Sequence, residues 1–480
     1  MKVLFVASEA LPFCKTGGLA DVAGSLPQAL GTCDIDARLI LPRYDALKTG
    51  NLEIQTLGSL SIPFDGVLQR ATLQRAFSPE KPEQSTYFID APQYFARPNL
   101  YGYEDDLLRF GFFCRAVLEA LPIITARDNW RPDILHCHDW HTGLLAAYKS
   151  TLSSDLSPDF KTIFTIHNLV YQGLTDKSFL PRLGFDWSLF NYHQLEFFGK
   201  INALKSGLVF SDAITTVSPT YAREIQTHEQ GAGLDGVLAE HAHQLSGIIN
   251  GIDYREWNPQ SDSYLAANFS LEDLAGKAIC KADLQKQVGL PVDGSTPIVG
   301  IVSRLSSQKG FDLIASGMEK LLASHCQLVV LGAGDEYYMK LFEKLGARFK
   351  GRATFELGAY NEALAHKIYA GSDLFLMPSQ YEPCGLSQMI SLAYGTIPIV
   401  RATGGLADTI QQFDAQTETG NGFVFREYNT AAMLDSIQKA IKCFHSPHWP
   451  RLIQNAFQCD FSWDASAREY SELYCGLVKS

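Results

Sequence analysis

The sequence lacks the features that mark disulfide-rich secreted proteins and membrane proteins. Its ten cysteines are scattered singly, without a Cys-x-x-Cys pair, which indicates reduced thiols in a cytosolic protein. No apolar run approaches the roughly 20 residues of a membrane span. The apolar start of the chain is interrupted at Glu9, too early for a signal-peptide core. We therefore expect a cytoplasmic protein with no membrane partner.

Positive charge is also scarce. Lys and Arg number 40 against 52 Asp and Glu, which gives a net charge of −12. A chain of this sign is repelled by nucleic acid and by anionic membranes, so neither is expected as a partner. Any anionic ligand must then be held by a local positive pocket.

The chain has 480 residues, too many for one hydrophobic core, and its 46% of hydrophobic residues can fill at least two. Short apolar runs alternate with stretches of helical period throughout. This alternation predicts parallel sheets covered by helices on both faces. The predicted strands are Val3–Ala7, Ala37–Leu41, Tyr87–Asp90, Ile134–His138, Thr162–His167, Ala213–Val217, Ile298–Ser303, Leu328–Gly332, Ala353–Leu357, Leu374–Pro378, Ile397–Arg401 and Phe423–Phe425.

We expect an α/β protein with two doubly wound, Rossmann-like domains. The first is expected over residues 1–245 and the second over residues 246–458, followed by a C-terminal helical segment, 459–480. Within the first domain, residues 59–77 are predicted to form a β-hairpin. The amphipathic stretch 463–479 is predicted to be a helix.

One hexapeptide, Thr-Gly-Gly-Leu-Ala-Asp, occurs identically at residues 16–21 and 403–408. Each copy follows a predicted strand and opens a predicted helix, where glycines let a ligand approach and free N–H groups favour an anion. Either copy alone is also explained by a turn that needs glycine. The repetition favours two anion- or sugar-binding turns, and two facing domains would place a cleft between them.

Basic side chains lie at the predicted strand ends. Arg304 and Lys309 follow a strand and sit at a helix start, so both can reach one diphosphate, although surface cations are the commoner explanation. Lys15 adds a third cation before the first glycine turn. Tyr360 is interpreted either as a platform for a nucleobase or as a core residue.

Polar side chains end other predicted strands. Asp139, within the histidine-rich stretch 136–141, and the pair His167 and Asn168 are candidates for contacts with sugar hydroxyls. The histidines also invite a metal interpretation, but no partner cluster with ligand spacing accompanies them, so no metal site is predicted. Glu382 precedes a helix, where its carboxylate can bind hydroxyls or stabilise an oxocarbenium ion, or can simply favour the helix start.

Taken together, these motifs resemble those of bacterial glycogen synthases and plant starch synthases (glycosyltransferase family 5). They occur in the family order from near the first residue to beyond residue 408. The matching segments are residues 15–21, 138–141, 165–168, 217–221, 249–253, 304–309, 382–386 and 403–406.

The resemblance implies a hexosyltransferase of the GT-B fold, with its C-terminal helix crossing back onto the first domain. It implies retaining transfer of glucose from ADP-glucose to the non-reducing end of glycogen or another α-1,4-glucan, with release of ADP. No metal or other cofactor is implied. Many retaining GT-B enzymes carry a second Glu eight residues after the first, but Ile390 occupies that place here.

The resemblance also implies roles for individual residues. Lys15, Arg304 and Lys309 would hold the diphosphate, and Asp139 would line the acceptor side. The implied catalytic residues are His167, Glu382, Arg304, Lys309 and Asp139. The implied donor-binding residues are Lys15, Gly18, Asp21, Asn168, Arg304, Lys309, Tyr360, Cys384, Gly385, Leu386, Thr403, Gly404, Gly405 and Leu406.

Three other classes compete with this interpretation. Another GT-B transferase or an epimerase would not be expected to share the paired Thr-Gly-Gly-Leu turns. A dinucleotide-dependent oxidoreductase needs a third glycine where Tyr337 follows the turn at residues 332–334. A non-catalytic glucan-binding protein would not need the three cations.

Overall fold

The computed structural model contains two compact units, each described below by itself. The first comprises residues 1–251 and the stretch from Trp463 onward, and the second comprises residues 252–462. The first unit extends past residue 245 because residues 245–247 add a strand to its sheet. The residues that the structure describes are 1–48, 50, 52–78, 81–151 and 160–479.

The first unit is built on a sheet in which nine strands fall within the described residues, in the order β12-β11-β7-β6-β1-β2-β5-β4-β3. The strands from β12 to β5 run parallel, and β1 is almost wholly buried, as a strand covered on both faces must be. Their bounds are β1 (Lys2–Val6), β2 (Asp36–Pro42), β3 (Glu53–Phe64), β4 (Val67–Ser78), β5 (Lys81–Asp90), β6 (Ile134–His138), β7 (Lys161–Ile166), β11 (Ala213–Thr216) and β12 (Leu245–Gly247).

The predicted hairpin is present as β3 and β4, and it extends the main sheet through β5. Its turn is Asp65-Gly66, where both residues have positive φ, at 53° and 75°. A two-residue turn of this kind matches the twist of an antiparallel pair. A separate small sheet is formed by β8 (Leu174–Asp176), β10 (Lys200–Asn202) and β9 (Glu196–Phe197).

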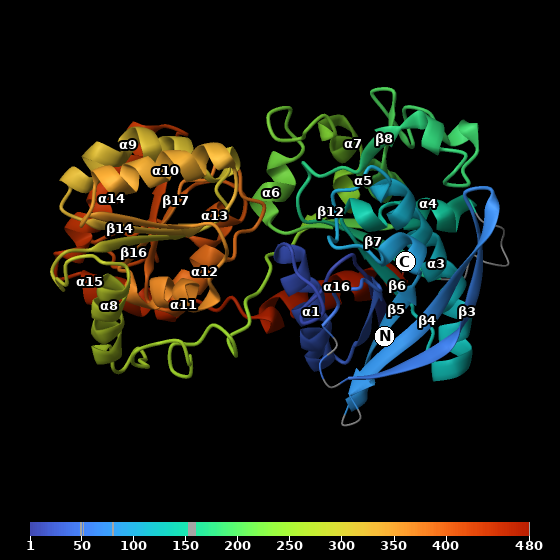
Figure 1. Ribbon diagram of the computed structural model, residues 1–480, viewed down its shortest axis with the longest axis horizontal. Helices are drawn as coiled ribbons and strands as arrows, with labels where there is room; N and C mark the ends of the chain where they lie inside the picture. The colour runs from blue at the N-terminus through green and yellow to red at the C-terminus, as the bar shows by residue number, and fades with distance from the viewer. Residues whose placement is uncertain (49, 51, 79–80, 152–159, 480) are drawn as a thin grey trace. The chain divides into compact units, whose positions relative to one another are not determined.

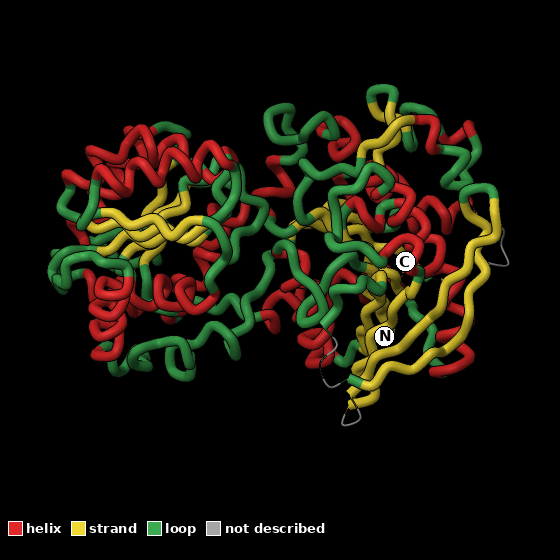
Figure 2. Tube along the Cα trace, viewed as in Figure 1, coloured by secondary structure: helices red, strands yellow, loops and turns green. Residues whose placement is uncertain are grey.

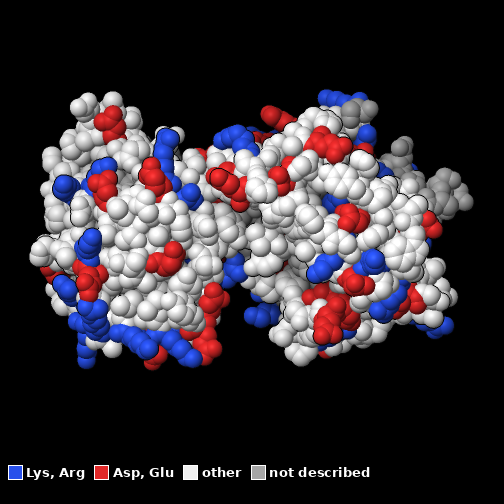
Figure 3. All heavy atoms as spheres, turned by 90° about the horizontal axis from the view of Figure 1, so that it is seen from above, with Lys and Arg blue, Asp and Glu red and all other residues white. Residues whose placement is uncertain are grey.

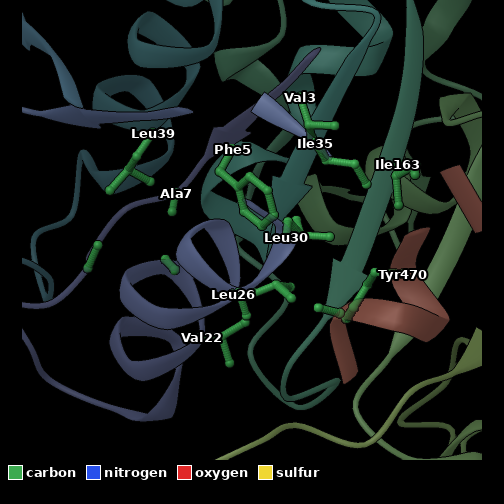
Figure 4. Close-up of a cluster of buried hydrophobic side chains, with 14 of the residues drawn as sticks. Val3, Phe5, Ala7, Val22, Leu26, Leu30, Ile35, Leu39, Ile163 and Tyr470 are labelled. Carbon is green, nitrogen blue, oxygen red and sulfur yellow. The ribbon is translucent and has the colours of Figure 1, made fainter. Parts of the chain in front are cut away.

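Helix α16 (Trp463–Lys479) packs beside α1 (Gly18–Leu30) in the first unit, although the two are far apart in the sequence. In α1, Val22, Leu26 and Leu30 recur on one face and are fully buried. They share a core with β1 and with Tyr470 of α16 (Figure 4). The other helices of the unit are α2 (Pro92–Phe95), α3 (Asp106–Asp128), α4 (Leu144–Thr151), α5 (Ala203–Phe210), α6 (Pro219–Glu224) and α7 (Asp235–Glu240).

The second unit holds a fully parallel sheet with the strand order β15-β14-β13-β16-β17-β18 among the described residues. Helices cover both of its faces (Figure 2), with α9 and α10 on one side and α8 and α11 on the other (Figure 1). Its strands are β13 (Ile298–Val302), β14 (Gln327–Gly332), β15 (Ala353–Leu357), β16 (Leu374–Met377), β17 (Ile397–Arg401) and β18 (Phe423–Phe425).

The two ends of the second unit lie together, since the backbone N–H of Ile252 donates to the carbonyl of Phe461 at 2.8 Å. Helices packed on a mainly parallel sheet in the first unit and on a fully parallel sheet in the second confirm the predicted α/β fold class. Among the described residues, no helix combines the length and apolarity needed to cross a membrane. The helices of this unit are α8 (Ala275–Gln287), α9 (Phe311–Ala323), α10 (Glu336–Arg348), α11 (Glu362–Gly371), α12 (Ser387–Ala393), α13 (Gly404–Thr409), α14 (Thr430–Phe444) and α15 (Trp449–Phe457).

Candidate functional site

The predicted site residues of the second unit gather where the strand order of its sheet reverses. From β13 the chain builds outward through β14 to β15, and β16 then pairs with the other side of β13. Ligands of open α/β sheets bind at the carboxyl ends of the strands on either side of such a reversal. A cavity of about 200 Å³ lies there, and both Arg304 and Lys309, which follow β13, line it.

Lys309 and Glu382 form the central ion pair of this site. The Lys309 ammonium donates to Glu382 Oε2 at 2.6 Å, and the Ser379 hydroxyl donates to the same oxygen at 3.0 Å. Glu382 is only 5% exposed, so its charge is largely shielded from water and depends on these two donors. The structure therefore brings together two residues that lie 73 positions apart in the sequence.

Arg304 differs from Lys309 because its side chain is exposed and has no ion-pair partner within the described ranges. Acidic and basic side chains are interspersed over the face drawn in Figure 3, without one dominant positive field. An anion at this edge of the sheet must therefore be held by local groups, of which the Arg304 guanidinium is available.

The second glycine turn packs directly against the backbone around Glu382. The N–H of Gly405 donates to the carbonyls of Glu382 at 3.2 Å and Pro383 at 3.1 Å. A β-carbon on Gly404, whose φ is 44°, would lie 1.9 Å from the Glu382 carbonyl oxygen. All four residues of 403–406 are buried. The N–H of Gly405 is thus engaged within the protein, whereas the sequence predicted a helix start with free donors.

The loop that follows Glu382 is held by a residue that sequence analysis did not assign. Gln388, fully buried, donates through Nε2 to the carbonyls of Cys384 at 3.1 Å and Gly385 at 3.0 Å, and to the Thr409 hydroxyl at 3.1 Å. Cys384 is itself buried, and Leu386 is the residue just before α12. In the sequence, Gln388 was recognisable only as a glutamine about one helical turn beyond this loop.

Tyr360 lies after β15, at the same carboxyl edge of the sheet but not among the residues that line the cavity. Its side chain is 62% exposed, so the core interpretation is wrong. An exposed aromatic ring beside a ligand-binding edge keeps the stacking interpretation open.

The first unit has a matching reversal at β1, which pairs with β6 on one side and β2 on the other. Asp139 follows β6 with a φ of 57°, and its carboxylate accepts the backbone N–H of His167, after β7, at 2.8 Å. Burial raises the pKa of Asp139 to about 7, although backbone N–H groups of His167 and Asn168 act in the opposite direction. The Asn168 side chain accepts the N–H of Val170 at 3.2 Å.

The raised pKa of Asp139 predicts a pH-dependent stability. Between about pH 4 and pH 7 the unfolded chain ionises this carboxyl while the folded chain keeps it protonated, so the free energy of unfolding falls as pH rises through this window. Asp139→Asn keeps an acceptor for the same N–H groups and removes the titration. Denaturant unfolding should show the wild type losing up to a few kcal/mol relative to this variant from pH 4 to pH 7. Parallel profiles for the two proteins would contradict the assignment.

The His167 ring contacts a second buried histidine, His138, for which the sequence suggested only a metal interpretation that was not adopted. His138 Nδ1 lies 3.0 Å from His167 Nε2, so the two rings share one hydrogen bond. Burial lowers the pKa of His167 to about 3 and that of His138 well below its ordinary value. Both rings are neutral at pH 7, and the shared hydrogen bond requires one ring to donate and the other to accept, which couples their tautomers.

His136 is a structural link within the first unit. Its ring nitrogens lie 2.8 Å from the Tyr474 hydroxyl on α16 and 2.6 Å from the Thr165 hydroxyl on β7. Both nitrogens therefore have protein partners. The ring joins the C-terminal helix to the strands that end at Asp139 and His167.

The first glycine turn already binds a carboxylate of the protein itself. The Glu9 side chain accepts the Thr16 hydroxyl at 2.7 Å and also the Thr16 backbone N–H. Burial raises the pKa of Glu9, and the bonds from Thr16 oppose that effect. Beside it, the Lys15 ammonium pairs with Asp21 at 2.6 Å, while Gly18 is exposed at the helix start. Sequence analysis used Glu9 only to mark the end of an apolar run.

Comparison with known proteins identifies the family. Residues 2–240 match the model of the starch synthase catalytic domain, and residues 284–458 match that of the group 1 glycosyl transferases. A glycogen synthase of Geotalea uraniireducens is 46% identical over 99% of this chain and 98% of its own length. A glycogen synthase of Desulforudis audaxviator is 43% identical over 99% of this chain and 96% of its own length.

Among solved structures, the catalytic domain of starch synthase IV from Arabidopsis thaliana, bound to ADP and acarbose, has a TM-score of 0.91 and 36% identity. The match covers 100% of this chain and 99% of that one. The starch synthase model covers the positions of Lys15, Asp139 and His167. The group 1 glycosyl transferase model covers those of Arg304 and Glu382. The chain therefore belongs to the family of bacterial glycogen synthases and plant starch synthases, which are hexosyltransferases of the GT-B fold.

Proposed function

We propose that this chain transfers glucose from ADP-glucose to the non-reducing end of an α-1,4-glucan, with retention of configuration and release of ADP, in the cytoplasm. The observation that carries the proposal is the pair of cations, Arg304 and Lys309, beside Glu382 at the reversal point of the second sheet. The ADP and acarbose bound to the similar starch synthase IV support a nucleotide-sugar donor and a glucan acceptor.

In the second unit, Arg304 and Lys309 are proposed to hold the diphosphate. Arg304 offers a guanidinium with no ion-pair partner among the described residues, and Lys309 can exchange part of its contact with Glu382 for a phosphate oxygen. Glu382 and the backbone at residues 382–386 and 403–406 would then face the glucose. Tyr360 is assigned to the nucleobase.

In the first unit, His167 and Asn168 are assigned to glucose hydroxyls and Asp139 to the acceptor side. Lys15, Gly18 and the Asp21 carboxylate that pairs with Lys15 form an anion-binding turn, in which a phosphate would take the place that the Glu9 carboxylate holds here. The other donor-binding residues are proposed to have the roles that the family resemblance implies.

The chemistry is proposed to proceed on one face of the sugar. The bond between glucose C1 and the phosphate oxygen breaks, a bond forms from C1 to the acceptor 4-hydroxyl oxygen, and the departing phosphate takes the hydroxyl proton. The cations stabilise the negative charge that develops on the diphosphate. Ile390, in place of a second Glu, leaves no further carboxylate at that position. A trapped covalent glucosyl-enzyme would contradict this route.

The test supplies the purified protein with labelled ADP-glucose or UDP-glucose and glycogen, with and without a metal chelator. The expected result is label in the glucan from ADP-glucose, at the same rate with chelator. Label from UDP-glucose alone would overturn the donor assignment, and absence of label from both donors would overturn the proposed activity.

The contact between His138 and His167 leads to a second prediction. His138→Phe removes the hydrogen bond to His167 Nε2 and with it the restraint on the orientation and tautomer of the His167 ring. The kcat should then fall roughly tenfold, the equivalent of one hydrogen bond. The KM for the donor should change less than kcat.

His141→Phe is the matched control. His141 is also buried, but its ring packs on Trp140 with centroids 4.1 Å apart, and among the described residues it forms no hydrogen bond or ring contact with His167. Steady-state kinetics on both variants, with thermal unfolding beside them, separates positioning from stability. Equal losses of kcat in the two variants would show that His138 acts only through packing.

A further inference from the structure

Three side chains of the second unit that have no part in the proposed transfer come together near the start of α11. Glu256, Glu362 and His366 each offer one ligand atom, and these atoms all lie within 4.8 Å of one another. Glu362 and His366 are one turn apart on α11 and so share a face of the helix. Glu256 comes from the segment that enters the second unit. Exposed acidic groups often meet without binding an ion, so the imidazole decides whether this cluster is a site.

The His366 ring is held in a fixed orientation. Its Nδ1 lies 2.7 Å from Asp262 Oδ2, and the Tyr394 hydroxyl donates to the same oxygen at 2.6 Å. The ring stacks on Trp257, with centroids 4.1 Å apart and an angle of 15° between the planes, and His366 is only 2% exposed.

Asp262 Oδ2 accepts the Tyr394 hydroxyl, and as the acceptor for His366 as well it places the ring hydrogen on Nδ1. This leaves a lone pair on Nε2. That atom is buried and has no hydrogen-bond partner among the residues that the structure describes. A buried polar atom without a partner requires an explanation, and a bound ion is one of the few that chemistry provides.

A carboxylate that orients an imidazole, whose other nitrogen is a free ligand, is the arrangement found around protein-bound metal ions. The carboxylates of Glu256 and Glu362, each with an oxygen within 4.8 Å of a ring nitrogen of His366, supply negative charge as well as ligands. Mg²⁺ and Ca²⁺ favour sites made only of oxygen, whereas Zn²⁺ and its neighbours accept imidazole together with carboxylate. We propose that Glu256, Glu362 and His366 bind a first-row divalent transition-metal cation such as Zn²⁺, with Asp262 orienting the histidine.

The cation would join α11 to the segment that carries Glu256 and Asp262, so its effect falls on the stability of the second unit. It has no part in the departure of the diphosphate. Metal binding at this site and metal-independent glucose transfer are therefore compatible, and they are measured separately.

The test uses the full chain, treated with chelator and dialysed, and titrated with Zn²⁺ by calorimetry. Because the ten cysteines and the other histidines also attract Zn²⁺, the site is read from the difference between the wild type and Glu256→Gln/Glu362→Gln. We expect one more Zn²⁺ per chain in the wild type, and affinity at least tenfold weaker in either single variant. Zn²⁺ should raise the thermal midpoint of the wild type but not that of the double variant.

Glu336→Gln is the matched control, because Glu336 lies in the first turn of α10 as Glu362 does in that of α11. It should bind Zn²⁺ as the wild type does. Asp262→Asn should weaken binding without removing a ligand, which tests the orienting role. Equal Zn²⁺ stoichiometry in the wild type and the double variant would overturn the proposal, as would displacement of Zn²⁺ by equimolar Ca²⁺.

Discussion

Replacing Lys309 with alanine should lower kcat/KM for glucose transfer by roughly a hundredfold to a thousandfold. The ammonium is assigned to the departing diphosphate, and removal of one such electrostatic group from an active site has an effect of about this size. The measurement is incorporation of labelled glucose into glycogen at several donor concentrations. Lys340→Ala provides the control, because the Lys340 side chain is 68% exposed on α10 and pairs with Glu336 at 2.6 Å.

The same substitution also affects stability, and the two effects can be separated. Without Lys309, the 5% exposed Glu382 carboxylate keeps its bond from Ser379 and has no other side-chain donor among the described residues. This should cost about 1–3 kcal/mol of unfolding free energy. Lys309→Ala/Glu382→Gln removes the unpaired charge and should recover most of that stability without recovering activity. Recovery of activity in the double variant would mean that Lys309 serves only to neutralise Glu382.

Gly404→Ala should have a comparable effect on activity through the backbone alone. A β-carbon there would lie 1.9 Å from the Glu382 carbonyl oxygen and 3.2 Å from that of Pro383, so the glycine turn and the Glu382 loop must separate. We expect a loss of kcat/KM of about a hundredfold, with a higher KM for the donor, because backbone placed for the sugar moves.

Gly351→Ala tests whether this loss comes from contact rather than from conformation. Gly351 also has a positive φ, 80°, but a β-carbon there would meet no heavy atom within 4 Å. It should cost only the strain of a left-handed residue, about 1–2 kcal/mol, with unchanged kinetics. If Gly404→Ala behaves in the same way, close packing of the turn on Glu382 is not needed for transfer.

The strands and the family could be predicted from the sequence because both depend on local patterns. Each predicted strand is present, since continuous apolar runs such as residues 298–302 have few alternatives to a buried parallel strand. Strand β12 was missed because Leu245–Gly247 is short and half-buried. Its assignment depends on pairing with β11, a contact that no local pattern contains.

Candidate site residues that follow strands could be predicted from the sequence, but the residues that hold them in place could not. Asp139 and Arg304 follow strands, and that position alone made them candidates. The roles of Glu9, Gln388 and His138 depend on partners elsewhere in the fold, such as the contact of His138 with His167 29 residues away. The partner of Lys309 was equally hidden: the sequence predicted ligand-binding roles for Lys309 and Glu382, but not the ion pair between them.

The helix that begins at Trp463 has a consequence for how the chain is made. The first unit needs this helix to cover α1 and the His136 ring, yet the ribosome must first produce the whole of residues 252–462. At about 5–20 residues per second, this interval lasts roughly ten to forty seconds. During it, the nascent first unit exposes the apolar surface that Tyr470 and Tyr474 later cover, while the uninterrupted second unit can already fold. Newly synthesised chains should therefore be clients of chaperones that recognise this face until translation passes the last helix.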